Sequence, residues 1–197
     1  MKYILILLIT AFITISCKAQ NPIYPIKDWS KKQNNAYYKD VDNEMDAFEG
    51  TWFYTNGNTS LKLVLVKKLM YYNGKYYRDI VVGEYQYIEN GVELINTLSD
   101  INLNLGSSHN IKGNNIVKSC KFLPVSDCSE GEVRLSLALT NPGTDHYANV
   151  LLHKRVINGQ QALKARVVFN YIGDYNEEGT IPDPIMPWQQ EYLLIKQ

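Results

Sequence analysis

The feature that most limits the folds open to this chain is a series of turn signals that separates short apolar stretches. Each signal is an asparagine closely followed by a glycine: Asn56-Gly57, Asn73-Gly74, Asn90-Gly91, Asn141-Pro142-Gly143 and Asn158-Gly159. Asparagine and glycine accept the positive φ angles of tight hairpin turns, so the segments on either side of each signal are expected to pair as antiparallel neighbours. The sequence therefore predicts successive hairpins.

The stretches between these turns have the composition and the period of β-strands. They are rich in β-branched, leucine and aromatic residues, and Leu135, Leu137 and Leu139 alternate with less apolar neighbours along one stretch. We predict strands over residues 51–55, 61–67, 78–88, 92–98, 133–140, 148–156, 162–171 and 191–196. No amphipathic segment of helical length separates these strands, which argues against the α/β fold classes.

Antiparallel strands joined mainly by hairpins must close on themselves or leave long edges exposed. We therefore predict an all-β fold, an antiparallel meander that closes into a β-barrel, with a two-sheet sandwich as the alternative. If the barrel holds a cavity, one alternating set of side chains should line it. That set is Leu135, Leu137, Leu139, Val150, Leu152 and Phe169.

The segment before the first strand predicts a tether followed by a short helix. Residues 17–39 are polar and show no sustained period, which is typical of a linker. In residues 40–48, Val41, Met45 and Phe48 form one apolar stripe of a short helix with acidic residues in its first turn. These acidic residues could instead bind calcium, but a solvated helix face is the simpler interpretation. A single domain is thus expected over residues 40–197.

The first residues of the chain indicate export. A basic start and an apolar run over residues 4–15 are typical of a secretory signal and too short to cross a bilayer. Ser16 followed by Cys17 is where bacterial lipoprotein processing cuts, so we predict a signal peptide over residues 1–16 and a lipid, palmitate included, on Cys17. Ordinary cleavage after Ala19 is the alternative and would release a soluble secreted or periplasmic protein.

Cysteine parity supports lipidation. The chain has three cysteines, and an exported protein with an odd number leaves one unpaired unless it is modified. If Cys17 carries lipid, Cys120 and Cys128 remain as a pair, and we predict a disulfide that closes a short loop. A metal site built on these cysteines and nearby histidines lacks any recognised zinc spacing. We therefore expect no metal and no cofactor.

One short motif resembles the opening of lipocalin-like barrels. The run Phe48-Glu49-Gly50-Thr51-Trp52 stands at the start of the first predicted barrel strand. In that family the tryptophan closes one end of the barrel, often against a basic residue from a late strand. The resemblance implies a closing role for Trp52, with Arg166 as its expected basic partner.

A second resemblance covers nearly the whole chain. Four runs are similar to an uncharacterised lipoprotein family of Bacteroidota, described as a domain of unknown function: Ser16-Cys17-Lys18-Ala19-Gln20, Phe48-Glu49-Gly50-Thr51-Trp52 with Thr55-Asn56-Gly57-Asn58-Thr59-Ser60, Gly83-Glu84-Tyr85-Gln86-Tyr87, and Tyr192-Leu193-Leu194-Ile195-Lys196-Gln197. This resemblance implies an address in the cell envelope and carries over no catalytic or binding residue. The lack of an acidic cluster after Cys17 favours an anchor that faces the periplasm.

The chemistry of the sequence favours binding over catalysis. With 20 basic and 20 acidic residues, the chain has no charge excess that would attract nucleic acid. No Gly-x-Ser-x-Gly elbow accompanies Ser107, Ser108 and His109, which are interpreted as loop residues, and no phosphate-binding glycine loop occurs.

We therefore expect a non-enzymatic, lipid-anchored, lipocalin-like barrel of the bacterial envelope that binds a small apolar ligand or lipid. The alternative is an envelope interaction protein, of inhibitor or immunity type, with a filled core and partner-binding loops at residues 98–118 or 173–188.

Overall fold

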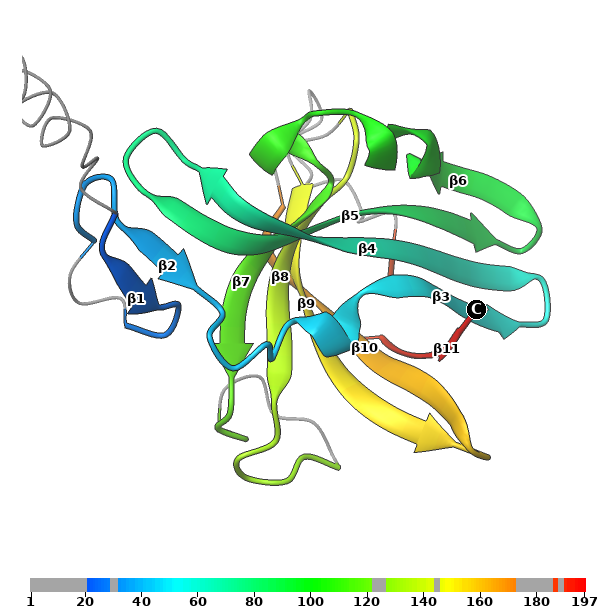
Figure 1. The fold of residues 1–197 in the computed structure, drawn as a ribbon. Coiled ribbons are helices and arrows are strands. Elements are labelled where there is room, and N and C mark those ends of the chain that lie inside the picture. Colours follow the sequence, from blue (N-terminus) through cyan, green and yellow to red (C-terminus); the bar gives the residue numbers. More distant parts are fainter. Residues whose placement is uncertain (1–20, 29–31, 122–126, 144–145, 173–185, 188–189) are drawn as a thin grey trace, which may run out of the picture.

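The computed structural model describes residues 21–28, 32–121, 127–143, 146–172, 186–187 and 190–197. The strands are β1 (Ile23–Pro25), β2 (Tyr37–Lys39), β3 (Gly50–Asn56), β4 (Thr59–Tyr72), β5 (Tyr77–Glu89), β6 (Val92–Asn96), β7 (Ile111–Val117), β8 (Arg134–Thr140), β9 (His146–Ile157), β10 (Gln160–Ile172) and β11 (Glu191–Lys196). Three 3-10 helices are η2 (Asp46–Phe48), η3 (Leu98–Asn102) and η4 (Gly106–Ser108). Eight strands form a closed antiparallel barrel (Figure 1). The predicted all-β barrel is therefore confirmed.

The barrel is a meander in which neighbours along the chain are neighbours in space. Going round it, β3, β4, β5, β7, β8, β9, β10 and β11 follow one another, and each pair is antiparallel. The last strand returns to the first through the pairs Ile195↔Phe53 and Lys196↔Trp52. The ring has no free edge, which is how a barrel solves the exposed-edge problem of a meander.

Each of the five turn signals lies between consecutive strands, as predicted. In two of them both residues have a positive φ: Asn90 and Gly91 at 51° and 82°, and Asn158 and Gly159 at 50° and 79°. This pair of left-handed residues is the geometry of a type I′ hairpin turn, whose twist matches that of the flanking strands. The turn residues therefore set the neighbour-to-neighbour order of the barrel.

Strand β7 was not predicted, since residues 98–118 were expected to form a loop. Its sequence contains Gly113, Asn114 and Asn115, which are turn formers, but the structure uses them at a bulge between Lys112 and Asn115. Gly113 has a φ of 155°, and a Cβ there would lie 3.2 Å from the Cα of Leu137. The bulge thus needs a glycine for both its backbone angle and its close approach to β8. β6, which was predicted as part of the meander, pairs with β5 outside the ring.

The helix predicted over residues 40–48 is wrong except for the three residues of η2. Asn43 has a φ of 52°, which interrupts a right-handed helix. The buried Asp40 carboxylate accepts hydrogen bonds from the backbone N–H groups of Glu44 and Met45 at 3.0 and 2.9 Å. Its charge therefore stabilises a turn instead of a helical first turn. Met45 and Phe48 are fully buried as the apolar stripe predicted, whereas Val41 is exposed.

Most of the predicted tether packs against the barrel. β1 pairs with β2 in parallel, and β2 pairs in parallel with β5 through Tyr37↔Tyr77 and Tyr38↔Arg78. The hydroxyl of Tyr37 donates to Asp79 Oδ1 at 2.6 Å, and burial beside this carboxylate raises the pKa of Tyr37. The described residues between 21 and 39 are therefore part of the folded unit, which differs from the free linker expected there.

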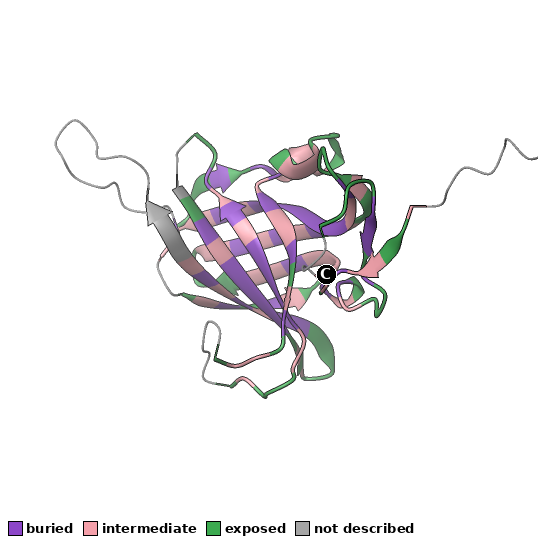
Figure 2. Cartoon of the chain, turned by 90° about the vertical axis from the view of Figure 1, so that its left-hand side faces the viewer, coloured by how far each residue is buried: buried purple, intermediate pink, exposed green. Residues whose placement is uncertain are grey.

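The barrel interior is filled by one apolar cluster to which all eight barrel strands contribute. Figure 2 shows buried residues alternating with less buried ones along the strands. The cluster includes Trp52, Leu61, Leu63, Leu65, Val81, Tyr85, Tyr87, Ile111, Leu135, Leu137, Leu139, Ala148, Val150, Leu152, Leu163, Ala165, Val167, Tyr192 and Leu194. Within the described residues, no helix is long and apolar enough to cross a membrane.

Trp52 closes one end of this cluster, where β3 begins. Its side chain is 1% exposed, its Nε1 donates to the carbonyl of Phe48 at 2.9 Å, and the Lys196 ammonium lies 5.2 Å from the ring centroid. Gly50 has a φ of 128°, and a Cβ there would meet Lys196 Cε at 3.0 Å. The Gly-x-Trp spacing therefore lets the Lys196 side chain cross β3 to reach the indole.

The basic residue on Trp52 is thus Lys196, whereas Arg166 was expected. Arg166 lies between Ala165 and Val167 of β10, whose side chains are buried in the core, so its own side chain is on the outer face. There it lies 3.9 Å from Glu191 of the neighbouring strand. Lys196 instead stands directly opposite Trp52 in the pairing of β11 with β3.

Removing the Trp52 side chain should destabilise the protein. Trp52→Ala deletes a fully buried indole, so the free energy of unfolding should fall by roughly 3 to 5 kcal/mol in urea unfolding followed by circular dichroism. Leu69→Ala, at a side chain that is 65% exposed, is the control and should change it by less than about 0.5 kcal/mol. A Trp52→Ala midpoint equal to that of the parent would contradict the closing role.

A cleft beside Trp52 as the candidate ligand site

A cleft of about 810 Å³ lies beside the closed end of the barrel. It is bounded by the turn that carries η2, by the hairpin of β9 and β10, and by the end of β11. The lining residues are Asn43, Asp46, Ala47, Trp52, Lys154, Arg155, Val156, Gln161, Ala162 and Lys196. We call this site the Trp52 cleft. Its volume lies within the range of about 300–1,000 Å³ that is usual for small-molecule sites.

The floor and one wall of the Trp52 cleft are apolar. Trp52 and Ala162 are both 1% exposed, so they also belong to the barrel wall that separates the cleft from the core. Val156 lies on the rim and is 72% exposed, which is unusual for a valine in a long strand. These side chains can cover the apolar part of a ligand, and burial of Val156 would contribute about 25 cal/mol for each Å² removed from water.

The remaining wall of the cleft is cationic. Lys154 has no ion-pair partner within the part of the chain that the structure describes, and the Lys196 ammonium donates to Gln161 Oε1 at 3.1 Å while it lies over Trp52. The one carboxylate in the lining, that of Asp46, is paired with Lys67. The cleft therefore presents more positive than negative charge to a ligand.

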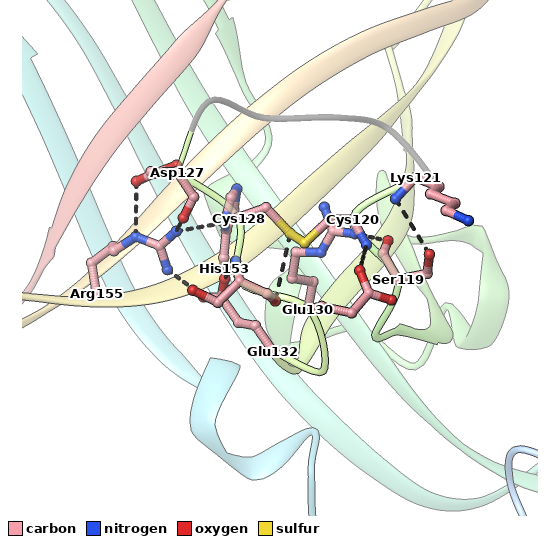
Figure 3. Close-up of a disulfide and its surroundings, with 11 residues drawn as sticks. Ser119, Cys120, Lys121, Asp127, Cys128, Glu130, Glu132, His153 and Arg155 are labelled. Atoms are coloured by element: carbon pink, nitrogen blue, oxygen red, sulfur yellow. Dashed lines mark hydrogen bonds and ion pairs between the residues drawn. A yellow bond between two sulfur atoms is a disulfide. The ribbon is translucent and has the colours of Figure 1, made fainter.

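Arg155, the third cation, is held by a network of Asp127, Glu132 and His153 near the disulfide (Figure 3). Its Nε donates to Asp127 Oδ2 at 3.1 Å, its Nη1 donates to Glu132, and its Nη2 lies 3.0 Å from His153 Nδ1. The hydrogen bond from Arg155 lowers the pKa of Asp127 to about 2. Two carboxylates thus compensate the guanidinium charge, so Arg155 shapes the wall while Lys154 and Lys196 remain available to an anion.

The predicted disulfide is present and supports this network. Cys120 and Cys128 are joined with Cα atoms 5.8 Å apart. Glu130 Oε2 accepts the backbone N–H of Cys120 at 2.9 Å, and Arg134 donates to the carbonyl of Ser119. Arg134 is fully buried although its neighbour Leu135 faces the core, and its contact with Ser119 ties β8 to the segment that precedes Cys120.

Five of the six residues predicted to line a cavity inside the barrel lie in the described core. Leu135, Leu137, Leu139, Val150 and Leu152 are at most 2% exposed and pack together in the core cluster. Phe169 lies in β10, but its side chain is outside the described part of the chain, as are Cys17 and residues 173–185. Of the predicted site residues whose side chains are described, Trp52 alone lines the cleft. The other lining residues come from the turn that carries η2 and from the ends of β9, β10 and β11. No local sequence pattern indicates that these segments meet.

The described residues include no group of three or more His, Cys, Asp or Glu side chains that could hold a metal ion. Asp40, from the cluster considered for calcium, instead accepts a hydrogen bond from Lys67 Nζ at 2.9 Å. The carboxylates of this segment are therefore committed to protein partners.

His153 gives the network a pH dependence. Burial and the adjacent Arg155 charge lower the pKa of His153 to about 4, from 6.5 in an unfolded chain. Between these pH values the unfolded state binds more protons, so the stability that depends on neutral His153 is complete above about pH 6.5 and is lost as the pH falls towards 4.

Acidification should therefore destabilise the protein through His153. The parent should lose up to about 3 kcal/mol of unfolding free energy through this group between pH 7 and pH 4. His153→Asn keeps an acceptor for Arg155 but does not titrate, so its loss over the same range should be smaller by that amount. Chemical denaturation at both pH values measures the difference. Parallel pH profiles for the two proteins would disprove the role of His153.

Comparison with known proteins gives one match. A model of a protein family described as "Family of unknown function (DUF6705)" matches residues 1–197. No curated protein and no solved structure matches the chain.

Proposed function

The chain belongs to this family of unknown function over its whole length, and we propose that it is a non-enzymatic lipoprotein of the bacterial cell envelope that binds a small amphiphile. In this proposal Cys17 carries the lipid, the barrel faces the periplasm, and the ligand lies in the Trp52 cleft. The ligand has an apolar body and an anionic head, as a fatty acid or a lipid fragment does.

One observation carries the binding proposal: the Trp52 cleft combines volume, apolar surface and unpaired positive charge. At about 810 Å³ it can hold a ligand of lipid or drug size. Trp52, Ala162 and Val156 would contact the apolar body, while Lys154 and Lys196 lie where they would face an anionic head. Because the predicted lining residues that are described pack into the core cluster, the proposal places the ligand in this outer cleft and not in the barrel lumen, where it was expected.

The same packed interior favours a second candidate function. A barrel filled with its own side chains needs no ligand, and a barrel of eight strands is narrow enough for side chains to fill it. The protein would then act through its surface as an envelope interaction protein of inhibitor or immunity type. The apolar residues exposed on β6 and on the loop that carries η3, among them Val92, Leu94 and Leu103, are the surface that suits a protein partner.

Val156→Asp tests the cleft directly. It removes an apolar wall and adds a charge that repels an anionic head, so the affinity for a fluorescent fatty-acid probe should fall at least tenfold. Val92→Asp makes the same change at a strand valine that is 59% exposed and does not line the cleft. This control should bind the probe within twofold of the parent.

Other outcomes separate the alternatives. Equal affinity of Val156→Asp and Val92→Asp would contradict the cleft, and loss of binding in Leu137→Trp alone would return the site to the barrel interior. A parent that does not bind the probe would support the surface-interaction candidate.

Lipid attachment is tested independently of ligand binding. Cys17→Ala should abolish incorporation of labelled palmitate and move the protein from the membrane fraction to the soluble fraction of a bacterial host. A Cys120→Ala and Cys128→Ala double variant is the matched control and should keep the label. Membrane attachment that survives Cys17→Ala would refute the anchor.

A further inference from the structure

A buried glutamate–histidine pair lies outside the barrel ring, on the outer face of β5. Glu84 and His109 are 0% and 1% exposed, and His109 Nδ1 lies 2.8 Å from Glu84 Oε1. Asn110 occupies the rest of the carboxylate: its backbone N–H donates to Oε1 at 3.3 Å and its Nδ2 donates to Oε2 at 2.8 Å. Glu84 therefore accepts three hydrogen bonds from the segment that follows η4.

This arrangement fixes the orientation of the imidazole. An ionised carboxylate only accepts hydrogen bonds, so the proton shared with Glu84 sits on His109 Nδ1. Nε2 is then the ring nitrogen left for another group, and among the described residues the ring is hydrogen-bonded through Nδ1. A carboxylate behind one nitrogen is the usual way in which a protein orients a histidine toward a ligand.

His109 lines a second pocket, of about 220 Å³, which we call the His109 pocket. Its other lining residues are Lys68, Leu69, Tyr71, Leu103, Asn104 and Gly106. The hydroxyl of Tyr71 donates to Ser107 Oγ at 3.0 Å and accepts the Ser107 N–H at 3.2 Å, which fixes the wall between β4 and η4. The volume is below the usual range for drug-sized ligands, so only a small molecule fits.

The polar groups of the His109 pocket favour an anion. Among the residues that the structure describes, no carboxylate lines it and Lys68 has no ion-pair partner. Leu69 and Leu103 stand at the pocket and are 65% and 51% exposed, so they can cover an apolar part of the same ligand. The Lys68 side chain is exposed and His109 lines the same pocket, so one anionic ligand can contact both groups.

We propose that the His109 pocket is a second binding site, separate from the Trp52 cleft, for a small carboxylic acid with a short apolar or aromatic body. The ligand carboxylate lies between Lys68 Nζ and His109 Nε2, which donates in the imidazolium form, and Glu84 compensates the imidazolium charge. Leu69 and Leu103 contact the ligand body.

Histidine-selective ¹⁵N labelling with NMR tests this, with sodium benzoate as the probe. The imidazole resonance of His109, assigned by its loss in His109→Gln, should shift saturably toward the protonated position as benzoate is added. Lys68→Gln should weaken benzoate binding at least fivefold. Lys75→Gln removes the same charge at an exposed site that does not line the pocket and should change the affinity by less than twofold.

Three results would overturn the proposal. They are no saturable shift of His109, an equal shift with the neutral isostere benzamide, and equal affinities of the Lys68→Gln and Lys75→Gln variants. Should His109→Gln fail to fold, nuclear Overhauser contacts from benzoate protons to the Leu69 and Leu103 methyl groups identify the site instead, and their absence counts against it. Val156→Asp should leave benzoate binding unchanged, so failure of the Trp52 cleft is distinguishable from failure of this site.

Discussion

Strand β5 pairs with β4 along one edge and with three different strands along the other. On that second edge, β2 pairs near the start of β5, residues 81–83 pair with β7 and residues 86–89 pair with β6. The middle contact continues the ring from β5 to β7, and the other two cover the ends of the edge on either side of it. Every other pairing of the ring joins strands that follow one another in the chain, or joins the last strand to the first. The pairing of β5 with β7 passes over β6, so the ring depends on how this edge of β5 is shared among three strands.

The division also explains the burial of β5 on both faces. From Asp79 to Tyr85 every residue is buried, because one face lines the core and the other is covered by the loop that carries η3 and η4. A charged residue on the outer face, Glu84, therefore needs internal partners, and the loop supplies them. The same loop brings His109 against the barrel, so the buried pair follows from the topology of one strand edge.

Most of the barrel could be predicted because its information is local. Alternating leucines in 133–140 and the asparagine–glycine turns specify strands and their order within a few residues of each feature. β7 could not be predicted in this way, since Gly113 and its two asparagines act through a bulge against Leu137 on another strand. The helix at 40–48 failed for a related reason: Asp40 is caged by backbone N–H groups and Lys67, a residue 27 positions later.

The sites were less predictable than the fold. Trp52 could be recognised because its Gly-x-Trp spacing is local, but Lys196 was identified only through the pairing of β11 with β3. His109 was interpreted as a loop residue and Glu84 was given no role, and nothing within either segment indicates that they meet. Both pockets are built from residues that are distant in sequence and that converge only after the ring has closed.

The packing of β1 and β2 on the barrel has a consequence for the distance between the domain and a membrane. A free linker over residues 17–39 could extend ~80 Å, whereas the six residues from Cys17 to Pro22, where the packed segment begins, reach only ~20 Å. With the proposed lipid on Cys17, the barrel would be confined to a thin layer next to the bilayer, with its β1–β2 side innermost. Any ligand or partner would then be met at the membrane surface and not in the open periplasm.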